Sequence, residues 1–90
     1  MQDLCNLKER VALVTGASSG LGVQFARTLA RYGAKIALIA RRREKLEEVQ
    51  EKVARLAECR YYQADVTKTE QVEAAVRKIA EDFGRIDILI

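Results

Sequence analysis

The chain has 90 residues, of which 49% are hydrophobic and 32% charged, so its length allows one compact domain and excludes a multidomain protein. The formal net charge is +3, and the run Arg41, Arg42 and Arg43 equals that whole excess, so the basicity is local and does not indicate nucleic-acid binding. No apolar run is long enough to span a bilayer, and the first ten residues lack the charged-then-apolar order of a signal peptide. The two cysteines, Cys5 and Cys59, form neither a CxxC pair nor a disulfide framework. These features predict a cytoplasmic protein with free thiols and no membrane partner.

The first half of the chain alternates strand and helix patterns. Residues 11–14 and 36–39 are short apolar runs, typical of strands buried on both faces. Between them a helical pattern over residues 19–32 stops at Gly33, and glycine suits the left-handed end of a helix. The predicted buried face of this helix consists of Phe25, Ala26, Leu29 and Ala30.

The second half continues the same alternation. Residues 43–58 predict an amphipathic helix, residues 60–64 a weaker strand, residues 67–83 a helix ending at Gly84, and residues 86–90 a last apolar strand. The spacing of Thr67 and Glu70 predicts a capping box at the start of the third helix. The second helix is expected to bury one stripe, made of Leu46, Val49, Val53 and Leu56.

Strands joined by single helices predict a doubly wound α/β fold with a parallel sheet, a partial Rossmann fold with the strand order 3-2-1-4. Right-handed crossovers then place the first two helices on one face and the third on the other. Half of the second face is left bare, and the strand over residues 86–90 becomes an apolar edge. We therefore expect self-association.

The segment between the first strand and the first helix is rich in glycine and serine. Gly16, Gly20 and Gly22 lie at this turn, where glycine lets a diphosphate approach backbone N–H groups and the helix N-terminus favours an anion. Ser18 and Ser19 can add hydroxyl donors. Alternatively, these residues only form a loop, with Ser19 as the N-cap. The spacing G-x-x-x-G-x-G also differs from the common dinucleotide motif G-x-G-x-x-G.

The stretch Thr-Gly-Ala-Ser-Ser-Gly-Leu-Gly over residues 15–22 resembles the TGxxxGxG motif of the short-chain dehydrogenase/reductase family, which binds NAD(H) or NADP(H) on a Rossmann sheet. Asp65 and Val66 are similar to the adenine-contacting pair of that family, and residues 83–90 are similar to its stretch leading into the fourth strand. The run over residues 11–45 looks most like gluconate 5-dehydrogenase and 3-ketoacyl reductase members.

The resemblance implies a role for each matching residue. Gly16, Ser18, Gly20 and Leu21 would line the phosphates and ribose, while Gly22 would allow close packing of the helix. Asp65 would accept a hydrogen bond from the adenine amino group. The alternative, from its position alone, is that Asp65 only leads into the third helix near Thr67.

The end of the second strand bears on the choice of cofactor. Ala40 stands 20 residues after Gly20, where an NAD-binding protein carries an acid for the ribose 2′-hydroxyl. Arg41, Arg42 and Arg43 follow, and arginine can hold a 2′-phosphate by charge-assisted hydrogen bonds. The alternative is a solvated, charged helix face. Cations at a helix N-terminus oppose its dipole, which favours a bound anion and hence NADP over NAD, with Arg41 as the leading contact.

The resemblance implies interconversion of an alcohol and a carbonyl through a Tyr-x-x-x-Lys pair. No such pair, no histidine and no metal-ligand cluster occurs in the sequence, so none of its residues is predicted to be catalytic or to bind a metal. Residues 1–90 are therefore expected to form one partial NAD(P)-binding domain, the N-terminal fragment of a longer enzyme. Two alternatives remain: a non-catalytic nucleotide-binding or interaction module, and nucleic-acid binding through the arginines and Tyr61-Tyr62.

Overall fold

The computed structural model describes residues 7–16 and 20–90, and in this part of the chain strands and helices alternate strictly. All the strands and helices predicted from the sequence are present. Their bounds are β1 Val11–Thr15, α1 Gly20–Arg31, β2 Lys35–Ala40, α2 Arg43–Val53, β3 Cys59–Gln63, α3 Thr69–Phe83 and β4 Ile88–Leu89.

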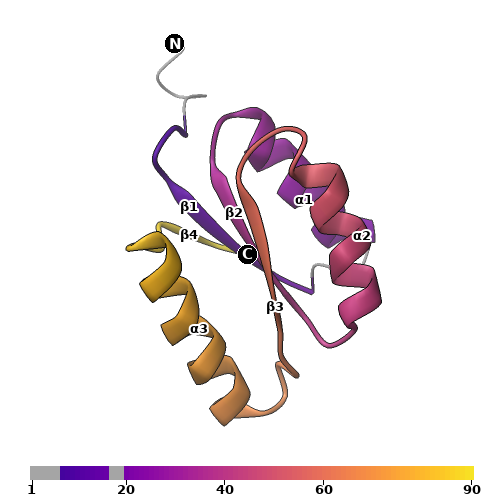
Figure 1. Ribbon diagram of the computed structural model, residues 1–90, viewed down its shortest axis with the longest axis vertical. Coiled ribbons are helices and arrows are strands. Elements are labelled where there is room, and N and C mark those ends of the chain that lie inside the picture. Colours follow the sequence, from indigo (N-terminus) through magenta and orange to yellow (C-terminus); the bar gives the residue numbers. More distant parts are fainter. Residues whose placement is uncertain (1–6, 17–19) are drawn as a thin grey trace.

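The strands form one parallel sheet in the order β3-β2-β1-β4, which confirms the predicted topology. Leu13 of β1 lies opposite Ala37 of β2 on one side and Leu89 of β4 on the other. The chain therefore moves outward from β1 to β3 and then reverses to place β4 on the far side of β1. Figure 1 shows α1 and α2 together on one side of the sheet and α3 on the other.

The central strands are buried on both faces, as their apolar runs predict. One core cluster joins Ala12 and Val14 of β1 to Ala26, Ala30, Leu46, Val49 and Val53 of α1 and α2. The second cluster joins Leu13, Ala37 and Ile39 to Ala75 and Ile79 of α3. Alternate residues of β1 thus belong to different cores, and this alternation fixes which face each helix covers.

The predicted buried faces of the first two helices need correction. In α1, Gly22, Ala26 and Ala30 form the buried stripe, whereas Phe25 is 41% exposed. A stripe of small residues lets the helix lie close to the sheet, and the bulky ring one position away points outward. Helix α2 ends at Val53 and not at residue 58, because the chain must turn back to enter β3 at Cys59. Leu56 lies in that turn and is 44% exposed.

The start of α3 also differs from the prediction. The N-cap is Lys68, whose side chain makes no capping hydrogen bond. The prediction of a capping box between Thr67 and Glu70 is therefore wrong. The Thr67 hydroxyl instead donates to a carboxylate oxygen of Asp65 at 2.7 Å. The helix C-terminus is as predicted: Gly84 has φ of +83°, a conformation that glycine adopts without the clash of a Cβ atom.

Strand β4 is shorter than predicted, and only residues 88–89 are in strand conformation. Backbone pairing with β1 nevertheless extends on both sides, because the Asp87 N–H donates to the Val11 carbonyl and the Ile90 N–H donates to the Leu13 carbonyl. As predicted, β4 is an edge strand, and its Leu89 is 70% exposed.

The second face of the sheet is covered by α3 only in part. A groove of about 410 Å³ remains between α3 and the β1–β4 side of the sheet. Its lining is almost entirely apolar and consists of Leu13, Thr15, Ile39, Val66, Val72, Val76, Ile86, Leu89 and Ile90. The predicted bare half-face is therefore present.

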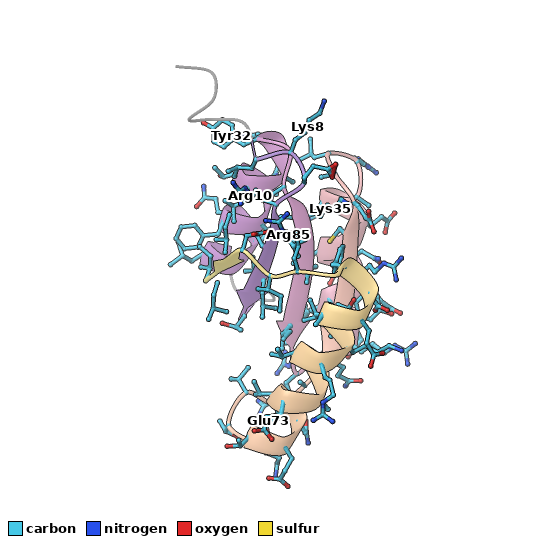
Figure 2. All side chains as sticks on the ribbon, turned by 90° about the vertical axis from the view of Figure 1, so that its left-hand side faces the viewer. Lys8, Arg10, Tyr32, Lys35, Glu73 and Arg85 are labelled. Atoms are coloured by element: carbon cyan, nitrogen blue, oxygen red, sulfur yellow. The ribbon has the colours of Figure 1, made fainter. Side chains whose placement is uncertain are left out.

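The segment before β1 closes the opposite end of the sheet from the strand carboxyl ends. The Leu7 N–H donates to the Tyr32 carbonyl at 2.7 Å, directly after the end of α1. Figure 2 shows Lys8, Arg10, Tyr32 and Lys35 gathered at this end, far from Glu73 on α3. The carboxyl ends of the strands, where α/β proteins bind ligands, are left open.

Candidate dinucleotide-binding site

A pocket of about 220 Å³ lies at the carboxyl ends of the first three strands. Gly16 follows β1, Ala40 and Arg41 end β2, and the segment after β3 supplies the rest of the lining. In a parallel sheet these three strand ends meet at one edge, which is where open α/β sheets bind ligands. The complete lining is Gly16, Ala40, Arg41, Ala64, Asp65, Val66 and Thr67.

The glycine turn forms one wall of this pocket. Gly16 has φ of +63°, and a Cβ atom built on it would meet no atom of the described residues within 4 Å. The conformation favours glycine, and the described residues leave the space beside it open. Ser18 and Ser19, predicted to donate to phosphates, lie outside the described residues.

The first turn of α1 carries the other predicted phosphate contacts. Gly20 starts the helix with open space where a Cβ would project, and Leu21 is 65% exposed. Gly22 is buried, which agrees with the close helix packing inferred for it. The N–H groups of a helix start point along its axis and, together with the helix dipole, favour an anion beside this turn.

Asp65 occupies the opposite wall and is held by hydrogen bonds on several sides. Its Oδ1 accepts from the Thr67 N–H at 3.0 Å and from the Thr67 hydroxyl at 2.7 Å, while its own N–H donates to Gln71 Oε1 at 2.8 Å. These bonds from Thr67, helped by the charge of Arg41, lower the pKa of Asp65 below its ordinary value. Asp65 therefore does lead into α3, as the positional alternative proposed.

The same geometry leaves Asp65 able to bind a ligand. Its second carboxylate oxygen, Oδ2, accepts no hydrogen bond from the described part of the chain. An ionised carboxylate fixed by Thr67 on one oxygen can accept a donor on the other. Val66, next in the chain, is 53% exposed and lines both this pocket and the apolar groove beside α3.

The structure assigns the three consecutive arginines to different positions. Arg41 lines the pocket, and its carbonyl accepts a hydrogen bond from Gln63 Nε2 at 3.0 Å. Arg42 is the exposed N-cap of α2 and is not part of the pocket lining. Arg43 pairs with Glu47 one helical turn later, at 3.6 Å. Of the two arginines predicted to contact the cofactor, only Arg41 thus lies at the pocket.

Several supporting residues were not identified from the sequence. Thr67 and Gln71 fix Asp65, and Gln63, the cross-strand neighbour of Ala40, holds the backbone of Arg41. The Asp-x-Thr spacing of residues 65–67 is typical of an Asx turn and could have indicated the first of these contacts. The glutamine contacts depend on the register of β2 and β3 and on the path into α3, for which the sequence has no local pattern.

No group of His, Cys, Asp or Glu side chains in residues 7–16 and 20–90 could hold a metal ion. Among the same residues, no helix combines the length and the apolar character required to cross a bilayer.

Comparisons with known proteins identify the family of the chain. Residues 10–90 match the family described as short chain dehydrogenase. An uncharacterized oxidoreductase of Staphylococcus saprophyticus is 44% identical over 85 residues, which cover 94% of this chain and 34% of that protein. The chain therefore spans about a third of the length of this relative.

Solved structures give the same result. The crystal structure of NAD⁺-bound xylitol dehydrogenase is 40% identical with a TM-score of 0.91, covering 92% of this chain and 32% of that one. A metagenomic short-chain oxidoreductase in complex with NADP is 36% identical with a TM-score of 0.86, covering 92% and 38%. One of these neighbours binds NAD⁺ and the other NADP, so the shared fold accommodates either dinucleotide.

Proposed function

Since the chain belongs to the short-chain dehydrogenase/reductase family, we propose that it forms the NADP(H)-binding part of an oxidoreductase that interconverts an alcohol and a carbonyl in the cytoplasm. The observation that carries this proposal is the pocket that brings Gly16, Arg41 and Asp65 together from the ends of three strands. When bound, the dinucleotide supplies or accepts a hydride. The residues described here bind and orient it.

The walls of the pocket suit the different parts of a dinucleotide. The open space beside Gly16 and Gly20 and the N-terminus of α1 accommodate the diphosphate. Asp65 is proposed to accept a hydrogen bond from the adenine amino group through Oδ2, which accepts none from the described residues, and the exposed side chain of Val66 would offer an apolar contact beside it. Ser18, Ser19 and Leu21 complete the proposed contacts, with Gly22 holding α1 close to the sheet.

The proposed preference for NADP(H) rests on Ala40 and Arg41. Ala40 ends β2 without the carboxylate that would bind a ribose 2′-hydroxyl, and Arg41 lines the pocket directly after it. The guanidinium can form two parallel hydrogen bonds to a 2′-phosphate. Arg42 is proposed to add a longer-range attraction, because it is exposed at the N-cap of α2.

Isothermal titration calorimetry of the chain with NADPH and with NADH tests this assignment. We expect tighter binding of NADPH, and we expect Arg41→Asp to weaken NADPH binding by about ten- to a hundredfold while NADH changes little. Arg77→Asp is the matched control, because it makes the same charge change at an exposed position on α3. Equal affinity for both cofactors would contradict the NADP preference, and no binding of either would contradict the site itself.

The chemical step is proposed to need residues beyond those of this sequence. It contains no Tyr-x-x-x-Lys pair and no histidine to move a proton to the carbonyl oxygen. We therefore expect this chain to bind NADPH without oxidising it in the presence of small aldehydes and ketones. Sustained loss of NADPH absorbance with the purified chain would contradict this assignment.

We also propose that the chain self-associates through the apolar groove beside α3 and the edge strand β4. This surface includes Leu89, which is 70% exposed, and the groove of about 410 Å³ next to it. Light scattering over a concentration series should show that the average molecular mass rises with protein concentration. The variant Leu89→Gln should reduce this rise. Leu56→Gln, at an exposed leucine after α2, is the control. A monomer at every concentration would refute the proposal.

A further inference from the structure

A second groove, of about 340 Å³, lies on the other face of the molecule, between α1 and α2. Figure 1 shows these two helices side by side, across the sheet from α3. The lining is basic apart from one leucine: Arg27, Arg31, Lys52, Arg55 and Leu56. It shares no residue with the pocket at the strand ends, so the proposed cofactor site does not account for it.

The four cations of this groove form no salt bridge within the described part of the chain. None of them forms an ion pair within 4.0 Å with any residue in 7–16 or 20–90, although pairs form elsewhere on α2, such as Lys45 with Glu48 at 3.8 Å. Helix α1 contains no aspartate or glutamate between Gly20 and Arg31 to neutralise its two arginines. The groove is therefore a local concentration of cations without salt-bridge partners among the described residues.

Helix stability explains only part of this arrangement. A cation in the last turn of a helix interacts favourably with the helix dipole, and Arg31 and Lys52 are in that position. Arg27 lies one turn earlier, four residues before Arg31, and like charges at this spacing repel. Arg55 lies beyond the end of α2. The helix ends therefore do not account for Arg27.

The chemistry of the lining selects among anionic partners. Three of the four cations are arginines, whose planar guanidinium groups match carboxylates with two hydrogen bonds. No aromatic side chain lines the groove, so the bases of a single-stranded nucleic acid would find nothing to stack on. Leu56, 44% exposed among the cations, adds an apolar contact that inorganic phosphate could not use.

We propose that this groove docks an acidic segment of a partner protein, with its carboxylates on Arg27, Arg31 and Arg55 and one apolar side chain on Leu56. Arginine is enriched in protein interfaces and among the residues that contribute most to binding, which favours a protein partner. The attraction is electrostatic at long range, so it should speed association and weaken as salt is added.

A direct test uses a fluorescein-labelled peptide of alternating aspartate and glutamate residues with one central leucine. Fluorescence anisotropy should show saturable, salt-sensitive binding to the chain. The double variant Arg27→Gln/Arg31→Gln should weaken binding by at least about tenfold. The matched control Arg77→Gln/Lys78→Gln removes the same charge from exposed positions on α3 and should change it little. Equal loss in both double variants would overturn the proposal, because it would reveal attraction to net charge only.

A second measurement locates the peptide without relying on a folded variant. A carbodiimide joins a peptide carboxylate to a nearby lysine amine with net loss of water, and mass spectrometry identifies the lysine. Lys52 should be the main product, ahead of Lys45 and Lys78. Main coupling at Lys78 would overturn the proposal. Tighter binding of tripolyphosphate or duplex DNA at this groove would overturn the choice of an acidic peptide.

Discussion

The carboxylate of Asp87 accepts a hydrogen bond from the backbone N–H of Val11 at 2.9 Å, across 76 positions of sequence. The Asp87 N–H donates in return to the Val11 carbonyl at 2.8 Å. The same carboxylate binds Arg85 through two hydrogen bonds and lies 3.5 Å from Arg10. Arg10 and Arg85 are seen at the same end of the sheet in Figure 2. Asp87 thus joins the start of β1 to the segment entering β4.

This contact predicts a pH dependence of stability. Hydrogen bonds from Arg85 and from the Val11 N–H lower the pKa of Asp87 below its ordinary value of 3.8. Because the pKa of Asp87 is lower in the folded chain than in the unfolded chain, its carboxylate stabilises the fold at pH values above the ordinary pKa. This stabilisation is lost as the pH falls through the lower, folded-state pKa. We expect Asp87→Asn to lower the thermal midpoint at neutral pH and to flatten its decline in acid.

The matched control for Asp87 is Glu81→Gln, which removes one negative charge from an exposed position on α3. Thermal unfolding followed by circular dichroism between neutral and acid pH is the measurement. If both variants show the same acid profile, Asp87 has no specific role in holding β1 to β4.

Gly16 and Gly84 share a left-handed backbone, with φ of +63° and +83°, but only Gly16 lines the strand-end pocket. No atom of the described residues lies within 4 Å of a Cβ built at either position, so an alanine there introduces backbone strain without a collision among them. We expect Gly16→Ala and Gly84→Ala each to cost about 1 kcal/mol of unfolding free energy.

Only Gly16→Ala should also weaken NADPH binding, because its methyl group would project where the diphosphate is proposed to lie. Urea denaturation gives the stability of both variants, and calorimetry gives their affinity. Equal affinity in the two variants would argue that Gly16 is needed for the turn alone.

Thr67 is predicted to control the ionisation of Asp65. The Thr67 hydroxyl makes the larger contribution that lowers the pKa of Asp65, and the Thr67 N–H makes the next. Thr67→Val removes the hydroxyl donor and keeps the N–H, so the pKa of Asp65 should rise but stay below its ordinary value. Carboxyl-carbon NMR titration measures it directly. Thr69→Val, at the exposed first residue of α3, should leave the titration of Asp65 unchanged.

Cys59 is a free, buried thiol at the start of β3, and burial raises its pKa from 9.0 to about 12. The thiolate is the reactive form of cysteine. Near pH 8, a pKa of about 12 makes the thiolate of Cys59 about a thousandfold less populated than that of a cysteine with the ordinary pKa. In a Cys5→Ser background, iodoacetamide should react slowly with the folded chain and quickly in denaturant. Rapid modification of the folded chain would show that β3 opens readily from the sheet.

The order of the strands and helices could be predicted from the sequence because each pattern is local. Apolar runs identify the strands buried on both faces, and Gly33 and Gly84 identify helix ends through a backbone conformation that other residues rarely adopt. Given the strand order 3-2-1-4 of the doubly wound fold, the right-handedness of the crossovers predicted the asymmetric helix layers and the bare groove as well. The pocket residues Gly16, Arg41 and Asp65 were also identified, from the glycine-rich turn, the missing acid at Ala40 and the resemblance to the family, and all three lie within two residues of a strand end.

The tertiary structure decided what depends on contacts between distant segments. The end of α2 was set by the turn into β3, which overrode the helical pattern of residues 54–58 and left Leu56 exposed. The Thr67 hydroxyl does not cap α3 but donates to Asp65. A short polar side chain can hydrogen-bond to any of several nearby groups, and the course of the backbone decides which of them lies within reach. The tertiary structure likewise decided that Arg41 lines the pocket while Arg42 and Arg43 do not. Side chains of consecutive residues leading into a helix point in different directions, so only one of the three reaches the pocket.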